Sequence, residues 1–260
     1  MNGQALSGLL HSPHELRAYL AGESHLPGPR GNLELAGAFA ALVEARVGAG
    51  DESVWPLCLA LAAMSPAEAP TNDPGEFVAF CGVRGIGAAG AADPDLAPAA
   101  LARLHDLAGD CRWRLREAVA QALQRLLASR REETLTALRA WVMEPAPLLW
   151  RAVAAGLADP PLLKESSLAM AALVLHETIL ANLGTLGDRR SDAFRSLRQG
   201  LGYSLSVVVA AVPADGFALM RRLALSVDRD MRWIVAENLK KGRLARPYPD
   251  QVATVRALLG

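Results

Sequence analysis

A short phrase occurs twice in this chain, and its spacing constrains the fold more than any other feature. The letters DCRWRLRE at 110–117 return as DMRWIVAE at 230–237, with the acid, Arg, Trp and Glu in matching places. The two copies lie 120 residues apart, which is three periods of about forty residues. Self-similarity at this period is typical of stacked helical repeats. The spacing therefore predicts a chain built from successive helix pairs.

The composition favours helices throughout. Apolar residues make up 52% of the chain and aromatic residues only 5%, and Ala and Leu dominate, which suits close helix packing better than sheets. The cleanest amphipathic pattern follows Asp110, with apolar residues at Leu115, Ala118, Val119, Ala122, Leu123 and Leu126. We predict an all-α protein, a right-handed α-α superhelix of about five to six helix pairs that forms a single domain over 1–260.

Two features depart from a plain helical pattern. Between 192 and 212 the pattern continues, but Gly200 and Gly202 interrupt it, so one kinked helix and two separate helices both remain open. Asn238 falls in the last repeat helix where the first copy of the phrase has Ala118 on its apolar face. We expect a buried amide there, bonded to backbone groups of the following loop.

The first copy of the phrase resembles a HEAT repeat. Asp110 opens the second helix of a pair, and Arg116 follows six positions later. In that family the acid and the Arg form a polar ladder between successive repeats, which satisfies helix N-termini and buried polar groups. The second copy keeps Asp230 but has Ala236 where the Arg would stand, so Arg232 would have to substitute.

The resemblance is to bacterial members of the HEAT-repeat, armadillo-like α-solenoid family. It is good over 95–157 and 213–244, looser over 33–94 and poor over 160–212. It implies a helical scaffold with a binding surface and little chemistry.

Charge is distributed unevenly, although the net charge is zero. Residues 1–110 hold 5 Lys or Arg and 13 Asp or Glu, an acidic half, whereas 111–260 hold 22 and 14, a basic half. This asymmetry can steer an anionic partner to one end, or let acidic and basic ends of neighbouring molecules attract each other. A plainer interpretation is that solvated helix faces carry more Arg in one half, with salt screening beyond ~8–10 Å.

Cysteine usage and hydropathy indicate a compartment. Cys58, Cys81 and Cys111 are an odd number without metal-binding spacing, so neither a disulfide framework nor a zinc site is expected. The N-terminus lacks the pattern of a secretory signal. The most apolar runs, 168–175 and 204–212, are shorter than the ~20 residues of a membrane span. We predict a cytoplasmic protein that does not contact a membrane.

Motifs that could carry chemistry have structural interpretations. GIGAAG at 85–90 matches G-x-G-x-x-G, but no strand precedes it and no βαβ unit follows, so we interpret the glycines as places of close helix packing. His11 and His14 share a helix face without an obvious third ligand. Cys58 and Cys81 lie in apolar runs, as core thiols do. We expect no cofactor, no metal ion and no catalytic nucleophile.

Tryptophan and arginine recur together and supply the candidate binding residues. Trp113, Trp150 and Trp233 could form a row that stacks on bases or fills a partner's pocket. Alternatively, each Trp anchors the two helices of its own repeat. Arg beside an exposed aromatic ring suits phosphate binding and stacking. The candidates are Arg112, Trp113, Arg116, Trp150, Arg151, Arg232, Trp233, Lys240, Lys241 and Arg243.

We expect a non-enzymatic binding scaffold whose partner is another protein. The alternative is nucleic-acid binding by the basic half, 111–260. An enzymatic form of this alternative comes from a similarity in length and class to a helix-repeat family of alkylpurine DNA glycosylases, which use a concave basic surface with aromatic residues and a carboxylate. No motif of that family aligns here, so it implies no catalytic residue. Asp110 and Asp230 are the only carboxylates near the tryptophans, and each is more simply a helix cap.

Overall fold

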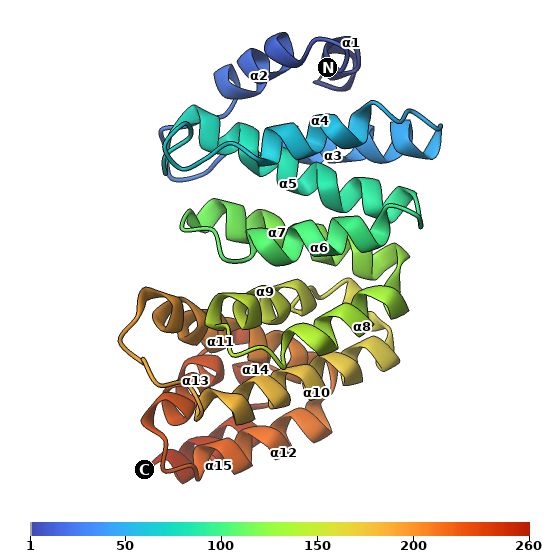
Figure 1. Ribbon diagram of the computed structural model, residues 1–260. Coiled ribbons are helices and arrows are strands. Elements are labelled where there is room, and N and C mark those ends of the chain that lie inside the picture. Colours follow the sequence, from blue (N-terminus) through green and yellow to red (C-terminus); the bar gives the residue numbers. More distant parts are fainter. Residues whose placement is uncertain (1) are drawn as a thin grey trace. The chain divides into compact units, whose positions relative to one another are not determined.

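The computed structural model describes residues 2–260, with side chains from Leu6 onward, and it is all-α (Figure 1). Fifteen α-helices and one short 3-10 helix follow one another, and no β-strand occurs within that range. The predicted all-α class is confirmed. Contacts divide the chain into two compact units, unit 1 ending at Thr134 and unit 2 spanning Leu135–Gly260. The division falls within α8 (Arg131–Trp141), and the single domain expected over 1–260 stays a prediction.

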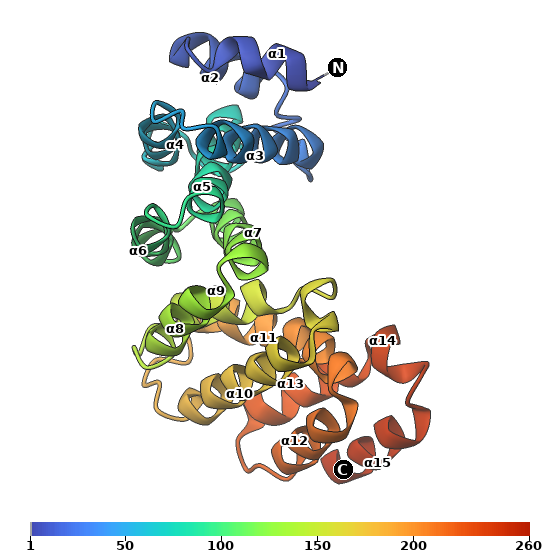
Figure 2. The same ribbon diagram turned by 90° about the vertical axis from the view of Figure 1, so that its right-hand side faces the viewer.

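Unit 1 is organised around the helix α5. Its helices are α1 (Asn2–Leu9), α2 (Pro13–Gly22), α3 (Leu33–Gly48), α4 (Val54–Ala62), α5 (Pro74–Ala92), α6 (Ala97–Leu107) and α7 (Trp113–Ser129). Both views show α5 between the α3–α4 pair and the α6–α7 pair (Figures 1 and 2), and it contacts all four of these helices. Fifteen of its 19 residues are buried, as expected of a helix that is covered on all sides.

The glycines of the GIGAAG segment permit this packing. A Cβ placed on Gly87 would lie 2.5 Å from the Cβ and 2.6 Å from the Cα of Ala122 in α7. A Cβ on Gly85 would lie 2.5 Å from the sulfur of Cys58 in α4, and one on Gly90 would be 2.6 Å from a side chain of α6. Because a glycine has no Cβ, each of these positions lets a different helix pack closely on α5: α7 at Gly87, α4 at Gly85 and α6 at Gly90. The interpretation of the motif as a packing device is confirmed.

Unit 2 is organised around the helix α11. After the end of α8 come α9 (Pro147–Leu157), η1 (Leu162–Lys164), α10 (Ser166–Leu183), α11 (Asp192–Ala211), α12 (Pro213–Ala224), α13 (Arg229–Leu239), α14 (Gly242–Ala245) and α15 (Pro249–Leu259). Helix α11 contacts α9, α10, α12, α13 and α14. It is one continuous helix of 20 residues, which decides the question left open by Gly200 and Gly202. Packing around Gly202 is tight, because a Cβ there would lie 3.0 Å from the ring of Trp233.

Helix α10 is longer than the apolar run that the sequence showed. Its 18 residues have a mean hydropathy of 1.4, which is long and apolar enough to cross a membrane by length and composition. Half of this window is buried inside the protein, as in a helix that contributes to a core. The expectation of no membrane contact stays a prediction.

A buried amide links α13 to α11. Asn238 is 0% exposed, and its Nδ2 donates to the carbonyls of Leu201 at 2.8 Å and Ile234 at 2.7 Å. Its Oδ1 accepts from the backbone N–H of Ser206 at 2.7 Å. Burial and backbone partners are confirmed, but the expected location of the partners was wrong. They belong to α11 and to α13 itself, because this face of α13 packs on α11 rather than on the following loop.

Candidate functional site

The three tryptophans occupy three different environments. Trp113, at the first position of α7, is 45% exposed. Trp150 is 1% exposed, which corrects its expected place among the binding residues, since it shares the buried face of α9 with Val153 and Leu157. Trp233 is half-buried, and the guanidinium of Arg198 lies 3.7 Å from the centroid of its ring. The three tryptophans therefore do not form a row of exposed rings.

Trp113 borders a small cavity in unit 1. The cavity measures about 180 Å³, and its apolar lining includes Phe77 and Phe80, whose rings stack 6.1 Å apart. The guanidinium of Arg114 lies 4.4 Å from the Trp113 ring centroid. Part of the π-face of Trp113 is therefore already covered by a cation from its own helix.

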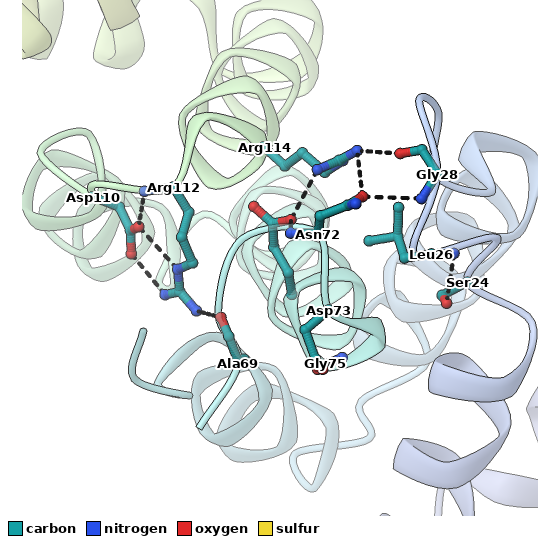
Figure 3. Close-up of polar contacts among 11 residues, drawn as sticks. Ser24, Leu26, Gly28, Ala69, Asn72, Asp73, Gly75, Asp110, Arg112 and Arg114 are labelled. Atoms are coloured by element: carbon teal, nitrogen blue, oxygen red, sulfur yellow. Dashed lines mark hydrogen bonds and ion pairs between the residues drawn. The ribbon is translucent and has the colours of Figure 1, made fainter. Parts of the chain in front are cut away.

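Arg112 is a structural residue, which corrects its expected place in a binding surface. Its side chain is 2% exposed and pairs with both carboxylate oxygens of Asp110, with Nε at 3.0 Å and Nη2 at 2.7 Å (Figure 3). Its Nη1 donates to the carbonyl of Ala69 at 3.0 Å. The family pattern implies a pair between Asp110 and Arg116. Instead, the carboxylate meets Arg112, and Arg116 donates to the backbone carbonyls of Asp110 and Cys111 at 2.7 and 2.9 Å.

Arg114 fastens α7 to two loops of unit 1. Its Nη1 lies 3.0 Å from Oε2 of Glu76, a carboxylate that is 0% exposed, and its Nη2 donates to the carbonyl of Gly28 at 2.8 Å (Figure 3). Glu76 also accepts from the backbone N–H of Asn72 at 2.7 Å, and the Asn72 side chain accepts from the N–H of Gly28 at 3.0 Å. The polar cluster at the start of α7 therefore points into unit 1, where it links α7 to the start of α5 and to the loop that contains Gly28.

The second copy of the phrase has different partners. The N-cap of α13 is Asp228, whose carboxylate accepts from the backbone N–H groups of Asp230 and Met231. Arg189 pairs with Asp228 at 2.7 Å and with Asp230 at 3.1 Å, and Arg198 pairs with Asp230 at 2.8 Å. The hydrogen bond from Arg189 holds the pKa of the Asp228 carboxyl below its usual value. The cap expected at Asp230 is thus Asp228, and Asp230 serves an ion-pair network.

Two further candidate arginines have neighbours within unit 2. Arg151 is half-buried, and its Cγ would lie 3.3 Å from a Cβ on Gly200. Arg232 is exposed, and its guanidinium donates to the carbonyl of Leu259 in α15. These contacts join α9 to α11 and α13 to α15.

The remaining candidates, Lys240, Lys241 and Arg243, line a cavity in unit 2. This basic cavity measures about 840 Å³. It is formed by three segments: the turn around η1, the end of α11, and the link from α13 into α14. The lining residues are Pro160, Leu163, Lys164, Val207, Ala210, Ala211, Lys240, Lys241, Gly242, Arg243 and Arg246. Five of them are cationic and none is acidic. Among the side chains described, from Leu6 onward, only Lys240 of these five has an acidic partner, Glu237, and the other four form no ion pair.

An exposed tyrosine lies beside the basic cavity. Tyr203 on α11 is 51% exposed, and its hydroxyl accepts a hydrogen bond from Nη2 of Arg243 at 2.7 Å. The guanidinium of Arg243 lies 4.6 Å and the Nζ of Lys241 5.8 Å from the ring centroid. Tyr203 was not among the binding residues predicted from the sequence. Its exposure could have been predicted, because it lies four residues after Gln199 and therefore on the polar face of α11.

A serine–histidine pair in the core of unit 2 cannot act as a catalytic dyad. His176 Nε2 lies 3.0 Å from the Oγ of Ser204, but the exposed fractions are 0% and 2%. Because Nδ1 lies 2.9 Å from the carbonyl of Ala172, which can only accept, the proton sits on Nδ1 and Ser204 donates to Nε2. Burial lowers the pKa of His176 to about 4. The pair is a neutral link between α10 and α11.

An apolar groove crosses α8 and α10. This methionine groove measures about 320 Å³, and three exposed apolar residues line it, Met143 at 71%, Met170 at 40% and Val174 at 53% exposure. Arg139 is its one charged lining residue. Flexible thioether side chains suit adaptable protein contacts.

The other sequence candidates for chemistry fall into the core or stay isolated. Cys58 and Cys81 are both fully buried, and burial raises the pKa of the Cys58 thiol to about 12, so they are core thiols as predicted. No cluster of three or more His, Cys, Asp or Glu suited to a metal ion occurs within the described part of the chain.

Comparison with known proteins adds no family: no protein-family model matches this chain, and no curated protein matches it.

Proposed function

We propose that this protein is a non-enzymatic binding scaffold of the HEAT-like α-solenoid type and that it binds nucleic acid through the basic cavity. The observation that carries the proposal is the lining of the cavity, with five cationic side chains and no acidic one. Clusters of Lys and Arg bind phosphates because each contact releases condensed counterions from the nucleic acid. Lys240, Lys241 and Arg243, named from the sequence, are joined there by Lys164 and Arg246.

The neighbours of two helices support the solenoid part of the proposal. In unit 1, α6 contacts α5 and α7, and in unit 2, α12 contacts α11 and α13 as well as α15, which lies farther along the chain. Helices of a repeat protein meet mainly their neighbours along the chain. A right-handed superhelix of five to six pairs would extend this local pattern over the whole chain.

Two observations favour binding over catalysis. The carboxylates of Asp110 and Asp230, which a glycosylase-like activity would need near the tryptophans, are engaged by Arg112, and by Arg189 and Arg198, respectively. The Ser204–His176 pair is buried away from solvent.

Fluorescence anisotropy with labelled DNA at several salt concentrations tests the proposal. Four cavity cations without acidic partners can neutralise about four phosphates, so log K should fall with log salt at a slope of about −3 for a single strand. Replacing Lys164 and Arg246 by Ala should weaken binding and make the slope shallower by about 1.4.

A matched control removes two exposed positive charges outside the cavity, by Arg190→Ala and Arg256→Ala. This control should change the affinity much less than the cavity variant. Equal losses in the two double variants would mean that general surface charge binds the DNA. No binding at low salt would remove the proposal.

The methionine groove favours a second candidate function, the protein partner expected from the sequence. We propose that Met143 and Met170 contact that partner, because such exposed apolar side chains gain free energy when covered. A protein retained from an extract of the source organism should be lost when both are replaced by Ser. Leu225→Ser, at another exposed apolar side chain, is the control and should retain it.

A further inference from the structure

The basic cavity also bears on which form of nucleic acid binds. Resting on the proposed function, we infer that the cavity binds a single strand whose base rings contact the protein, in preference to a duplex or a polyanion without bases. Three features carry this inference: an apolar floor, an oriented exposed tyrosine and the limited size of the cavity.

The floor of the cavity is apolar although its rim is cationic. Leu163 of η1 and Val207 of α11 line it and are 5% and 3% exposed, and Ala210 and Ala211 continue this surface along α11. A bare polyphosphate gains nothing from such a floor, because its oxygens would lose water there without a hydrogen-bond donor in return. A ligand that is complementary to both parts has anionic groups for the rim and a flat apolar surface for the floor.

Tyr203 adds an oriented ring at the edge of the cavity. Its hydroxyl is held by Arg243, which itself lines the cavity, at 2.7 Å. The residue is 51% exposed, and the guanidinium of Arg243 lies 4.6 Å from its ring centroid, so a base would stack on the part of the ring that this cation leaves uncovered. Because one hydrogen bond already restricts the ring, less conformational entropy is lost on binding. An aromatic ring beside cations that contact a backbone is the usual arrangement for single-stranded nucleic acid.

The size of the cavity favours a strand with free bases. The cavity is open to solvent and its volume is about 840 Å³, the size of a site for a small ligand, so it can accommodate only a short part of a chain. In a duplex the base faces are stacked on each other, and presenting one to a protein requires it to be flipped out at a cost. A single strand presents phosphates and base faces together.

The test compares ligands of equal phosphate number on the full-length protein. The ligands are a twelve-residue oligothymidylate, an abasic strand of the same length, a duplex and inorganic polyphosphate. We expect oligothymidylate to bind about tenfold tighter than the abasic strand or polyphosphate, as one base stack on an aromatic ring provides. It should also bind tighter than the duplex. Tyr203→Leu should remove most of the preference for bases while leaving the salt dependence unchanged, and Tyr203→Phe should retain that preference because it keeps the ring.

The outcomes separate the inference from the function on which it rests. Equal binding of the abasic strand and oligothymidylate, with the steep salt dependence intact, would overturn the single-strand inference and leave a general phosphate-binding cavity. Equal or tighter binding of the duplex would overturn it too. No binding of any of the four ligands at low salt would overturn the proposed function itself.

Discussion

The contact between Gly87 and α7 leads to a sharp prediction about stability. In an exposed or loosely packed helix, replacing Gly by Ala stabilises the protein by roughly 0.5–1 kcal/mol, because Gly has more backbone freedom to lose. At Gly87 the added methyl carbon would lie 2.6 Å from the Cα of Ala122, about 1 Å inside a normal carbon–carbon contact. The obstacle is backbone, so α5 and α7 must move apart and the core contacts between them weaken.

We expect Gly87→Ala to destabilise the protein by about 1–3 kcal/mol, the usual cost of overpacking. Gly37→Ala in α3 is the matched control, because its new Cβ would meet only the end of the Arg84 side chain, at 3.9 Å. That variant should stabilise by roughly 0.5–1 kcal/mol. The two substitutions are chemically identical, yet they should have opposite signs.

Urea unfolding followed by far-ultraviolet circular dichroism measures both variants. The midpoint should fall for Gly87→Ala and rise for Gly37→Ala, with similar slopes, so that the difference reports stability. If Gly87→Ala were as stable as Gly37→Ala, the close approach of α5 and α7 would be wrong, and the packing explanation of the GIGAAG motif would be wrong as well.

Two further predictions concern buried polar groups. Arg114→Met should lower the free energy of unfolding by about 3–5 kcal/mol, because it leaves the buried Glu76 carboxylate without its partner. Adding Glu76→Leu to this variant should recover much of that loss. Urea titrations measure both variants, and a loss below about 1 kcal/mol for Arg114→Met would contradict the role of the pair. His176 has a pKa of about 4 when folded against about 6.5 when unfolded, so the unfolded chain binds the extra proton and stability should rise by about 3 kcal/mol from pH 4 to pH 6.5. His176→Gln should flatten this rise, and unchanged pH dependence of the urea midpoint would exclude the histidine as its source.

The sequence predicted what depends on one helix and its immediate pattern. The apolar face of α7 is buried as expected, from Leu115 to Leu126, and the GIGAAG glycines are packing positions. Burial of Asn238 also followed from its place in the pattern. Each of these depends on spacing within a single helix, which a sequence contains directly.

Side-chain partners could not be predicted because they depend on where a helix begins and what packs on it. The repeated phrase places Trp113 at the first residue of α7 but Trp233 at the fifth of α13, since α13 begins at Arg229. The acids of the two copies therefore meet different arginines. Asp110 pairs with Arg112, two residues away, whereas Asp230 pairs with arginines of a preceding segment.

The basic cavity was predicted only in part for a similar reason. Its walls come from segments near 160–164, 207–211 and 240–246, and only the last of these looked basic enough to select from the sequence. Lys164 lies in the stretch 160–212, where the resemblance to HEAT repeats is poor. Which helix ends meet is determined by packing between distant segments, and one sequence does not contain that information.

The amide of Asn238 has a consequence for how the cavity opens. It grips the backbone N–H of Ser206, the residue directly before Val207 in the floor, and it stands two residues before Lys240 on the rim. Asn238 thus links α13, which leads into the rim, to α11, which carries the floor, and separating the two helices at this point would release that N–H to water. The hydrogen-exchange rate of the Ser206 amide therefore reports how often the cavity opens, and a ligand that bridges rim and floor should lower that rate.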